Sequence, residues 1–275
     1  MIVLEARNKK HWLIKLCSGE EFHCHLGYFS HDDIIGKVSY GAVIKLARGN
    51  LFIFRPTLRD FLNRYKKPTN IIYEEDAAAI VGLAGLGSGD VVVEIGTGSG
   101  GLTTYLANAV KPGGRVYTFD TKEIHCSTAR ENLELAGLSQ WVEIMTGDVL
   151  ENPEIIPVKE VESFFVDLPA PWLIVDVISR FLLPGGQAFF FIPNWSQVER
   201  LVGRALTENF VFTDIFEIIR RDYRVDPTRG VCHPANRQIV YTGIVTRAIK
   251  MIGEVDLSGK KKVMPESPVS NLNER

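Results

Sequence analysis

The chain has 275 residues, of which 45% are hydrophobic and 23% are charged. This balance is ordinary for a globular protein, and the length suits one large domain, alone or with a small one. The formal net charge is −2. A charge near zero argues against a protein that coats a polyanion over its whole surface, because such proteins are usually strongly basic.

No C-x-x-C pair occurs among the four cysteines, which are Cys17, Cys24, Cys126 and Cys232. The sequence therefore predicts neither a zinc knuckle nor a disulfide framework, which is typical of a reducing compartment. His23 and His25 would share one face of a strand, but no further ligand accompanies them, so we expect no metal site. No apolar run reaches the roughly 18 residues of a membrane span, and the N-terminus does not resemble a signal peptide. We expect a cytoplasmic protein that has no contact with a membrane.

Residues 1–55 alternate apolar and polar side chains in short runs that Gly, Ser and Asp separate. Such runs predict small antiparallel strands. The stretch 56–68 is amphipathic and basic, and Pro68 closes it. We therefore predict a small N-terminal β-rich domain with its connector over residues 1–68.

From residue 69 onward, predicted strands alternate with predicted helices. The strands are expected at 90–95, 115–119, 141–145, 163–166 and 187–192, and the helices at 75–85, 102–110, 121–136 and 172–183. Nearly continuous apolar strands between helices predict a parallel sheet covered on both faces. Residues 211–225 and 237–247 resemble two long strands of an antiparallel hairpin at the sheet edge. We predict one α/β domain over 69–256 and a disordered tail over 257–275, where apolar periodicity is absent.

A glycine-rich segment, E-I-G-T-G-S-G-G, runs from Glu94 to Gly101 between a predicted strand and a predicted helix. Glycines let a backbone turn sharply and approach a ligand closely. The first strand-to-helix crossover of an open α/β sheet is where such folds bind ligands. Gly96, Gly98 and Gly101 also satisfy the G-x-G-x-x-G pattern of dinucleotide sites, so a dehydrogenase is an alternative at this point.

Acidic residues stand at the ends of the later strands, namely Asp120, Asp148 and Asp167, and Glu94 precedes the glycines. S-adenosylmethionine carries a ribose diol, an adenine amino group and a cationic sulfonium, which all suit carboxylates, whereas a pyrophosphate would be repelled. Asp120 is placed to bind a ribose or to cap the next helix, and Asp148 to receive an adenine amino group or to shape a turn. The acidic strand ends therefore favour an S-adenosylmethionine-dependent methyltransferase.

Asp167 opens the segment D-L-P-A-P-W, in which two prolines fix the backbone and Trp172 offers an aromatic face. The segment resembles the D-P-P-Y motif of amino-group methyltransferases. Those enzymes orient a planar nitrogen nucleophile by hydrogen bonds and stack it on an aromatic ring. A capped turn without any chemistry is the alternative.

Several motifs together resemble the tRNA (adenine-N1)-methyltransferase family that modifies position 58 in the T-loop, especially its archaeal and bacterial single-subunit members. They are H-D-D-I-I-G-K (31–37), R-P-T-L-R-D-F (55–61), I-I-Y-E-E-D-A-A (71–78), the glycine-rich segment, D-L-P-A-P-W (167–172) and R-Q-I-V-Y-T-G (237–243). The resemblance covers about residues 15–250. It implies a seven-stranded, Rossmann-like class I methyltransferase domain with a small N-terminal β-domain, S-adenosyl-L-methionine as methyl donor, tRNA as substrate and a homotetramer. Some archaeal members also methylate position 57.

The resemblance implies two catalytic residues, Asp167 as the key carboxylate and Tyr73 beside the methyl donor. The predicted cofactor-binding residues are Ile72, Tyr73, Glu94, Gly96, Thr97, Gly98, Ser99, Gly100, Gly101, Leu102, Thr103, Asp120, Asp148, Val149 and Asp167. The chain departs from the family in two places. Tyr241 replaces the usual His before Thr-Gly, and Asp120 replaces the usual Glu at the end of the second strand.

Two other functions remain open on the sequence. One is a methyltransferase of the same fold that acts on protein carboxyl groups or small molecules. The other is a non-catalytic tRNA-binding subunit, although such a subunit is expected to lose the glycines or the fourth-strand carboxylate. For tRNA phosphates, the candidate contacts are Arg64, Lys66, Lys67, Arg220, Arg221 and Arg224, which otherwise form solvated charged faces.

Overall fold

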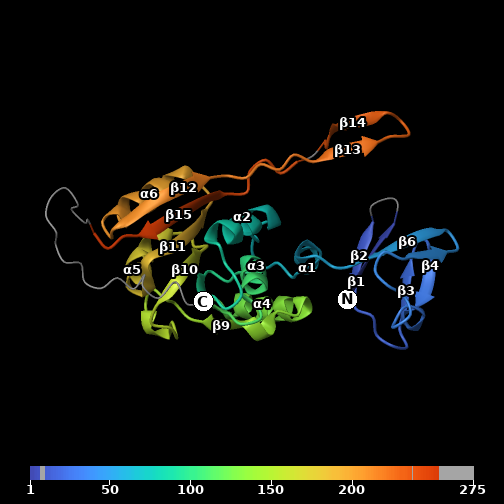
Figure 1. The fold of residues 1–275 in the computed structure, drawn as a ribbon, viewed down its shortest axis with the longest axis horizontal. Coiled ribbons are helices and arrows are strands. Elements are labelled where there is room, and N and C mark those ends of the chain that lie inside the picture. The colour runs from blue at the N-terminus through green and yellow to red at the C-terminus, as the bar shows by residue number, and fades with distance from the viewer. Residues whose placement is uncertain (7–9, 237, 254–275) are drawn as a thin grey trace, which may run out of the picture.

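The computed structural model describes residues 1–6, 10–236 and 238–253 (Figure 1). Its N-terminal part is a four-stranded antiparallel sheet in the order β2-β1-β6-β5. The strands are β1 (Ile2–Ala6), β2 (His11–Ile14), β5 (Val43–Leu46) and β6 (Gly49–Phe54). A separate hairpin pairs β3 (Glu21–Cys24) with β4 (Gly27–Ser30), and the 3₁₀ turn η1 (His31–Asp33) follows it. The predicted antiparallel strands are thus present in this region.

The alternating side chains of the N-terminal strands build a small core of their own. Leu4, Leu51 and Ile53 are almost completely buried there, together with Phe29 from the hairpin. Helix α1 (Leu58–Arg64) then leads toward the rest of the molecule, and it begins at the capping box that Thr57 forms with Asp60.

The larger sheet has seven strands in the order β12-β15-β11-β10-β7-β8-β9. Strands β7 (Val91–Ile95), β8 (Arg115–Asp120), β9 (Val142–Thr146), β10 (Val161–Val166) and β11 (Leu182–Ile192) are parallel. Strand β15 (Ile244–Lys250) runs antiparallel between β11 and the edge strand β12 (Phe210–Phe216). This is the α/β, Rossmann-like sheet that the sequence predicts.

Helices cover both faces of this sheet. On one face lie α2 (Glu74–Ala84), α3 (Gly101–Val110) and α4 (Glu123–Ala136), which pack on Phe165 and Phe189. On the other lie the 3₁₀ turns η3 (Pro153–Ile155) and η4 (Pro171–Leu173) with α5 (Val175–Phe181) and α6 (Trp195–Leu206), which pack on Phe164 and Phe190. The short η2 (Ser139–Trp141) precedes β9. Successive phenylalanines of one strand thus serve opposite faces, and each buried ring stabilises the fold by about 1.5–3 kcal/mol.

The structure differs from the prediction in three respects. The predicted helix 172–183 is shorter, because α5 ends at Phe181 and Leu182 already belongs to β11. Helix α6 is absent from the prediction, although Asn194 caps it by accepting a hydrogen bond from the backbone of Gln197 at 3.1 Å. The two long strands predicted at 211–225 and 237–247 are each shorter, and the chain between β12 and β15 leaves the sheet.

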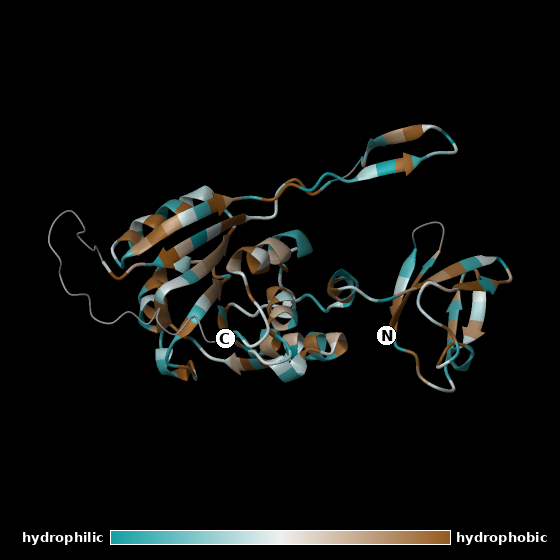
Figure 2. Cartoon of the chain, in the orientation of Figure 1, coloured by the Kyte–Doolittle hydropathy of each residue, from teal (hydrophilic) through white to brown (hydrophobic). Residues whose placement is uncertain are grey.

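The segment between β12 and β15 forms an arm that projects away from the sheet and ends in a hairpin of β13 (Tyr223–Asp226) and β14 (Val231–Pro234) (Figure 1). Apolar residues are exposed along it, among them Val225 and Ile239 (Figure 2). The arm has no partner strand from the large sheet, which is why long strands do not form there.

None of the helices in the described ranges is both long and apolar enough to cross a membrane. Within the same ranges, no three His, Cys, Asp or Glu side chains gather as they would around a metal ion. His23 instead stacks on Tyr28 and bonds to Glu21 at 3.0 Å. The predicted tail at 257–275 lies outside the described residues.

Candidate functional site

The glycine-rich loop joins β7 to α3 in a backbone conformation that only glycine adopts easily. Gly96, Gly98 and Gly100 have φ angles of +101°, +53° and +79°. A Cβ atom on Gly96 would lie 2.2 Å from the backbone oxygen of Asp167, and one on Gly101 would lie 2.2 Å from the side chain of Ile71. The missing side chains therefore let the ends of β7 and β10 and the segment before α2 meet at one place.

The polar side chains around the loop are bonded to one another. The buried Glu94 carboxyl accepts hydrogen bonds from the hydroxyls of Thr103 and Thr118, both at 2.6 Å. Since Thr118 donates its only proton there, Thr97 donates to Thr118 at 2.7 Å. Burial is the main cause that raises the pKa of Glu94 to about 8. Through these contacts Glu94 orders the loop.

Asp120 and Asp148 also bond to the backbone near the loop. The Asp120 carboxyl accepts hydrogen bonds from the backbone N–H groups of Gly98 and Lys122, both at 3.0 Å, and Nδ1 of His125 lies 3.1 Å from both oxygens. Asp148 accepts a bond from the backbone of Leu150 at 2.8 Å. The turn contact that the sequence allows for Asp148 is thus present, whereas Asp120 does not cap α4, whose N-cap residue is Lys122.

Asp167 is different, because its carboxyl takes part in no hydrogen bond or ion pair within the described part of the chain. Only its backbone N–H is bonded, to the oxygen of Ile95 at 2.9 Å. Burial, and secondarily the charge of Asp120, raise the pKa of Asp167 to about 6. The D-L-P-A-P-W turn thus presents a carboxyl beside the glycine loop that is available to a bound molecule.

The predicted residues fall into three places. Directly around the glycine loop, a small pocket is lined by Asn70, Ile71, Ile72, Glu94, Gly96, Thr97, Gly98, Ser99, Gly101, Leu102 and Asp167. The other residues predicted to bind a cofactor lie outside this lining. Gly100 and Thr103 belong to the turn and to α3, whereas Asp120, Asp148 and Val149 lie at or after the ends of β8 and β9. Tyr73 lines a different, larger cavity.

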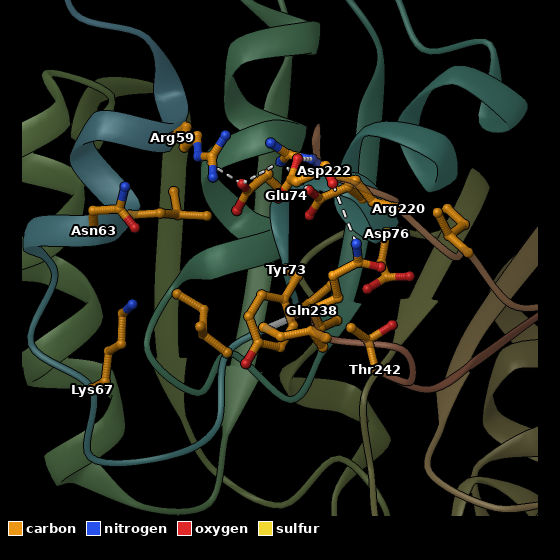
Figure 3. Close-up of a pocket in the computed structure, with 16 residues that line it drawn as sticks. Arg59, Asn63, Lys67, Tyr73, Glu74, Asp76, Arg220, Asp222, Gln238 and Thr242 are labelled. Carbon is orange, nitrogen blue, oxygen red and sulfur yellow. Dashed lines mark hydrogen bonds and ion pairs between the residues drawn. The ribbon is translucent and has the colours of Figure 1, made fainter. Parts of the chain in front are cut away.

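This larger cavity, of about 360 Å³, lies between α1, the start of α2 and the base of the arm (Figure 3). It is lined by Arg59, Leu62, Asn63, Lys67, Ile71, Ile72, Tyr73, Glu74, Glu75, Asp76, Ile218, Arg220, Asp222, Gln238, Ile239 and Thr242. Ile71 and Ile72 belong to both linings, so the two hollows share a wall. We call this space the α2 cavity.

Ion pairs at the rim of the α2 cavity join three segments. Glu74 binds Arg59 at 2.8 Å and Arg220 at 3.4 Å, and Arg220 also binds Glu75 and Asp222 (Figure 3). Arg220 is therefore held by three carboxylates, which disfavours it as a phosphate contact. Among the other predicted phosphate contacts, Lys66 binds Glu131 at 2.5 Å, whereas Lys67 forms no ion pair within the described residues.

Two polar groups in the α2 cavity are missing from the predicted site residues. Asp76, in the first turn of α2, is completely buried, and neither of its carboxyl oxygens has a hydrogen-bond partner. The hydroxyl of Thr242 is also buried and lacks a partner, although it lies near the Asp76 carboxyl. Burial raises the pKa of Asp76 to about 6, and the nearby Thr242 hydroxyl opposes this shift. The segment I-I-Y-E-E-D-A-A contains Asp76, but its spacing alone gives no sign that this carboxyl is left unbonded.

Tyr241, which departs from the usual family residue, donates a hydrogen bond from its hydroxyl to the backbone oxygen of Pro193 at 2.5 Å. Pro193 directly follows β11, so the tyrosine fixes the returning strand of the arm to the carboxyl edge of the sheet. On the same edge, the side chain of Gln197 donates to the backbone oxygen of Pro169 at 2.7 Å. These contacts hold the D-L-P-A-P-W turn, the start of α6 and the base of the arm together.

Comparisons with known proteins agree with this geometry. The chain is 32% identical to the tRNA (adenine(57)-N(1)/adenine(58)-N(1))-methyltransferase TrmI of Methanocaldococcus jannaschii, over 90% of this chain and 93% of that protein. It is 30% identical to the tRNA (adenine(58)-N(1))-methyltransferase TrmI of Thermus thermophilus, over 89% and 94% of the two chains.

Two solved structures are similar over almost the whole chain, each at 26% identity. One is an SAM-dependent O-methyltransferase from Thermotoga maritima, with a TM-score of 0.82 over 93% of this chain and 94% of that one. The other is the tRNA (m1A58) methyltransferase TrmI from Aquifex aeolicus, with a TM-score of 0.76 over 92% and 97%. The seven-stranded class I methyltransferase fold that the resemblance implies is therefore confirmed.

Two family models also match the chain. The model of the TrmI-like N-terminal region covers residues 2–44, and the model described as tRNA methyltransferase complex GCD14 subunit covers residues 49–244. With the glycine loop, the acidic strand ends and the D-L-P-A-P-W turn in place, the chain belongs to the GCD14 family of tRNA methyltransferase subunits.

Proposed function

We propose that this protein transfers a methyl group from S-adenosylmethionine to N1 of an adenine in the T-loop of tRNA, at position 58. The observation that carries the proposal is the free carboxyl of Asp167, whose backbone lies directly against Gly96 of the loop. The family match and the two TrmI relatives, each named for this reaction, support the substrate. The name of the archaeal relative also includes position 57, and methylation at that position would extend the proposal.

The residues around the loop suit S-adenosylmethionine chemically. Glycine backbone amides and the carboxylates of Asp120 and Asp148 offer donors and acceptors for an amino acid, a ribose diol and an adenine. We propose that all residues predicted from the sequence to bind the cofactor do so, with Glu94, Thr97 and Thr103 acting by holding the loop in shape. When bound, the methyl donor supplies an electrophilic methyl group on a sulfonium sulfur.

The protein's own task in the reaction is to bind and orient the adenine. N1 attacks with its lone pair and requires no prior deprotonation, so proximity and alignment supply much of the rate. The carbon–sulfur bond breaks as the nitrogen–carbon bond forms, and the ring becomes cationic. Asp167 accepts a hydrogen bond from the exocyclic amino group, stabilises this positive charge and can take up a proton. Tyr73 provides an aromatic surface beside the reacting atoms.

N1 lies on the Watson–Crick edge of adenine, so the target base must leave its pairing in folded tRNA. We propose that residues 1–68, the predicted N-terminal domain with its connector, support tRNA binding next to the methyltransferase domain at 69–256. The exposed apolar residues of the arm favour the homotetramer that the family resemblance implies. A cytoplasmic location stays a prediction from the sequence.

The proposal is tested by incubating the protein with S-adenosylmethionine that is labelled on its methyl group and with a tRNA transcript. Digestion to nucleosides and mass spectrometry then locate the label. We expect N1-methyladenosine in the T-loop. Label on protein carboxyl groups or on small-molecule hydroxyls would overturn the proposal, and would favour the O-methyltransferase activity for which the Thermotoga protein is named. An absence of transfer to every acceptor would favour a non-catalytic subunit.

A further inference from the structure

The α2 cavity contains buried polar groups that the proposed reaction does not use. Asp76 is completely buried, the hydroxyl oxygen of Thr242 is buried as well, and neither group has a partner at hydrogen-bond geometry, although the hydroxyl lies close enough to Asp76 to oppose the rise of its pKa. An unsatisfied buried polar group costs about 1–3 kcal/mol, and a carboxylate costs more, so such groups are normally paired. Both residues belong to the lining of the cavity, so a molecule bound there is placed to supply the missing partner.

The cavity adjoins the place that the methyl donor would occupy, because Ile72 and Tyr73, which are proposed to contact the donor, also line the cavity. Among the described residues, its lining includes none of the glycine loop, and it does not include Asp167. The only described residues common to both linings are Ile71 and Ile72. A molecule in the α2 cavity therefore lies next to the reaction centre rather than in it.

The lining has the chemistry of a nucleotide site. Its volume of about 360 Å³ lies in the range of ordinary small-molecule pockets. Tyr73 offers an aromatic surface, and the residue is 40% exposed. Asp76 and Thr242 line the cavity together with Tyr73, and Lys67 lies apart from them on the other side of the cavity (Figure 3). Proteins bind unstacked RNA bases in this manner, by stacking on an aromatic ring and by hydrogen bonds to base edges.

We propose that the α2 cavity binds a second nucleotide of the RNA substrate, one that is not methylated, and that Asp76 and Thr242 recognise the exocyclic amino group of its base. This inference rests on the proposed function. Asp76 is a pure acceptor when ionised, so it selects a base that carries an amino group and rejects one that carries only carbonyls at that edge. Lys67 binds the phosphate of the same nucleotide. The cavity thereby fixes the register of the RNA relative to the reaction centre.

The test uses tRNA transcripts in which one amino-bearing base at a time is replaced by its counterpart without the amino group. Purine riboside replaces adenosine, inosine replaces guanosine, and a pyrimidin-2-one riboside replaces cytidine. KM and kcat are measured for wild type, Asp76→Ala, Asp76→Asn and Thr242→Val. Thr246→Val is the matched control, because the Thr246 hydroxyl is also buried and unbonded but lies outside the cavity lining. Binding of S-adenosylmethionine verifies that each variant is folded.

We expect one non-target position at which loss of the amino group raises KM of the wild type about tenfold or more, as loss of a hydrogen bond to a charged group does. In Asp76→Ala the same replacement should have almost no further effect, and Asp76→Asn should give an intermediate result, since it keeps a neutral acceptor. Thr242→Val should raise KM for the unmodified tRNA, whereas Thr246→Val should not.

Three outcomes would overturn the inference while leaving the proposed function intact. In the first, no non-target position couples to Asp76 although the wild type methylates tRNA. In the second, Asp76 couples only to the amino group of the target adenine. In the third, Thr242→Val and Thr246→Val have equal effects. If the wild type transfers no methyl group to any tRNA, the proposed function fails, and the inference fails with it.

Discussion

Four acidic side chains of this protein fall into two pairs with opposite surroundings. Glu94 and Asp120 accept hydrogen bonds from the glycine loop and its neighbours. Asp167 and Asp76 accept no hydrogen bond at full geometry within the described chain, although Asp76 is completely buried and Asp167 is half-buried. The first pair orders the backbone, and Asp120 keeps lone pairs for a ribose, whereas the second pair has its full acceptor capacity for molecules from outside. Sequence position alone does not distinguish the two kinds, because three of the four stand at strand ends.

The largest effect is expected at Asp167. We expect Asp167→Ala to lower kcat by about 10²–10⁴-fold, since it removes both charge stabilisation and a possible proton acceptor. The dissociation constant for S-adenosylmethionine should change only a few-fold, as calorimetry can measure. Turnover close to that of wild type would remove Asp167 from the reaction.

The pH dependence of kcat tests the same role of Asp167. The pKa of Asp167 is raised to about 6 in the folded protein. Its carboxyl is therefore charged above about pH 6, and kcat should fall as the pH is lowered through this value. The pH profile of the single-turnover rate measures this. A rate that stays constant as the pH is lowered from neutral to well below this pKa would contradict a role for the ionised carboxyl.

The glycine loop is tested by a pair of substitutions with matched backbone angles. Gly96 and Gly89 have φ angles of +101° and +103°, but only the Cβ of Gly96→Ala would collide, at 2.2 Å from the Asp167 oxygen. Gly89→Ala should cost about 1 kcal/mol of unfolding free energy from backbone strain alone. Gly96→Ala should lower the unfolding free energy by more than Gly89→Ala does. It should also weaken cofactor binding at least about tenfold, which is a loss of about 1.4 kcal/mol of binding free energy. Equal effects in denaturant melts and binding titrations would show that the close approach at Gly96 is unimportant.

Removing a hydrogen-bond donor from Glu94 and removing the carboxyl of Asp76 should change the unfolding free energy of the protein in opposite directions. Thr103→Val removes a donor from buried Glu94 and should lower the unfolding free energy by about 1–2 kcal/mol. Asp76→Asn removes an unbonded carboxyl and should raise it near neutral pH by roughly 1–3 kcal/mol, given a pKa raised from 3.8 to about 6. Because the pKa of Asp76 is raised, the unfolding free energy of wild type falls as the pH rises from about 4 to about 6. The Asn variant lacks this carboxyl, so its advantage in unfolding free energy over wild type should develop across the same pH interval. Denaturant melts at several pH values measure both, and a loss of stability in Asp76→Asn would reveal a partner for Asp76.

The smallest effect concerns phosphate contacts. Lys67 has no ion pair within the described residues, whereas Arg220 is held by three carboxylates. Lys67→Ala should reduce the slope of log affinity for tRNA against log salt by up to about one, and Arg220→Ala should leave the slope unchanged. Binding titrations over a range of salt concentrations distinguish the two, and a reversed order would restore Arg220 as a phosphate contact.

Much of the large domain could be predicted from the sequence because its local signals agree with the fold. The apolar strands 91–95 and 161–166 lie close to their predicted limits, and Gly85 and Gly137 end their helices in the left-handed conformation, as a glycine after a helix indicates. Helix α6 is missing from the prediction even though Asn194 gives a capping signal and Val198, Leu201 and Ala205 have helical spacing. The arm could not be predicted, because its residues have strand-like composition but find no partner in the sheet.

The candidate site, like the fold, could be predicted only in part. Glycines and strand-end carboxylates are visible as a pattern, so the sequence predicts where a ligand would lie. Whether a given carboxyl is engaged depends on side chains brought from elsewhere, such as Thr118 and Thr103 around Glu94. Asp76 is absent from the predicted site for this reason, since nothing in the first turn of a helix indicates that its carboxyl will lie next to Thr242 from a distant part of the chain.

The central claim, that the protein methylates N1 of adenine in tRNA, is tested most directly by changing the atom that reacts. A tRNA transcript with 1-deazaadenosine at position 58 lacks only the proposed nucleophile, and a transcript with 7-deazaadenosine there retains it. We predict methyl transfer from labelled S-adenosylmethionine to the 7-deaza transcript and none to the 1-deaza transcript at that position. Equal transfer to both would contradict the account.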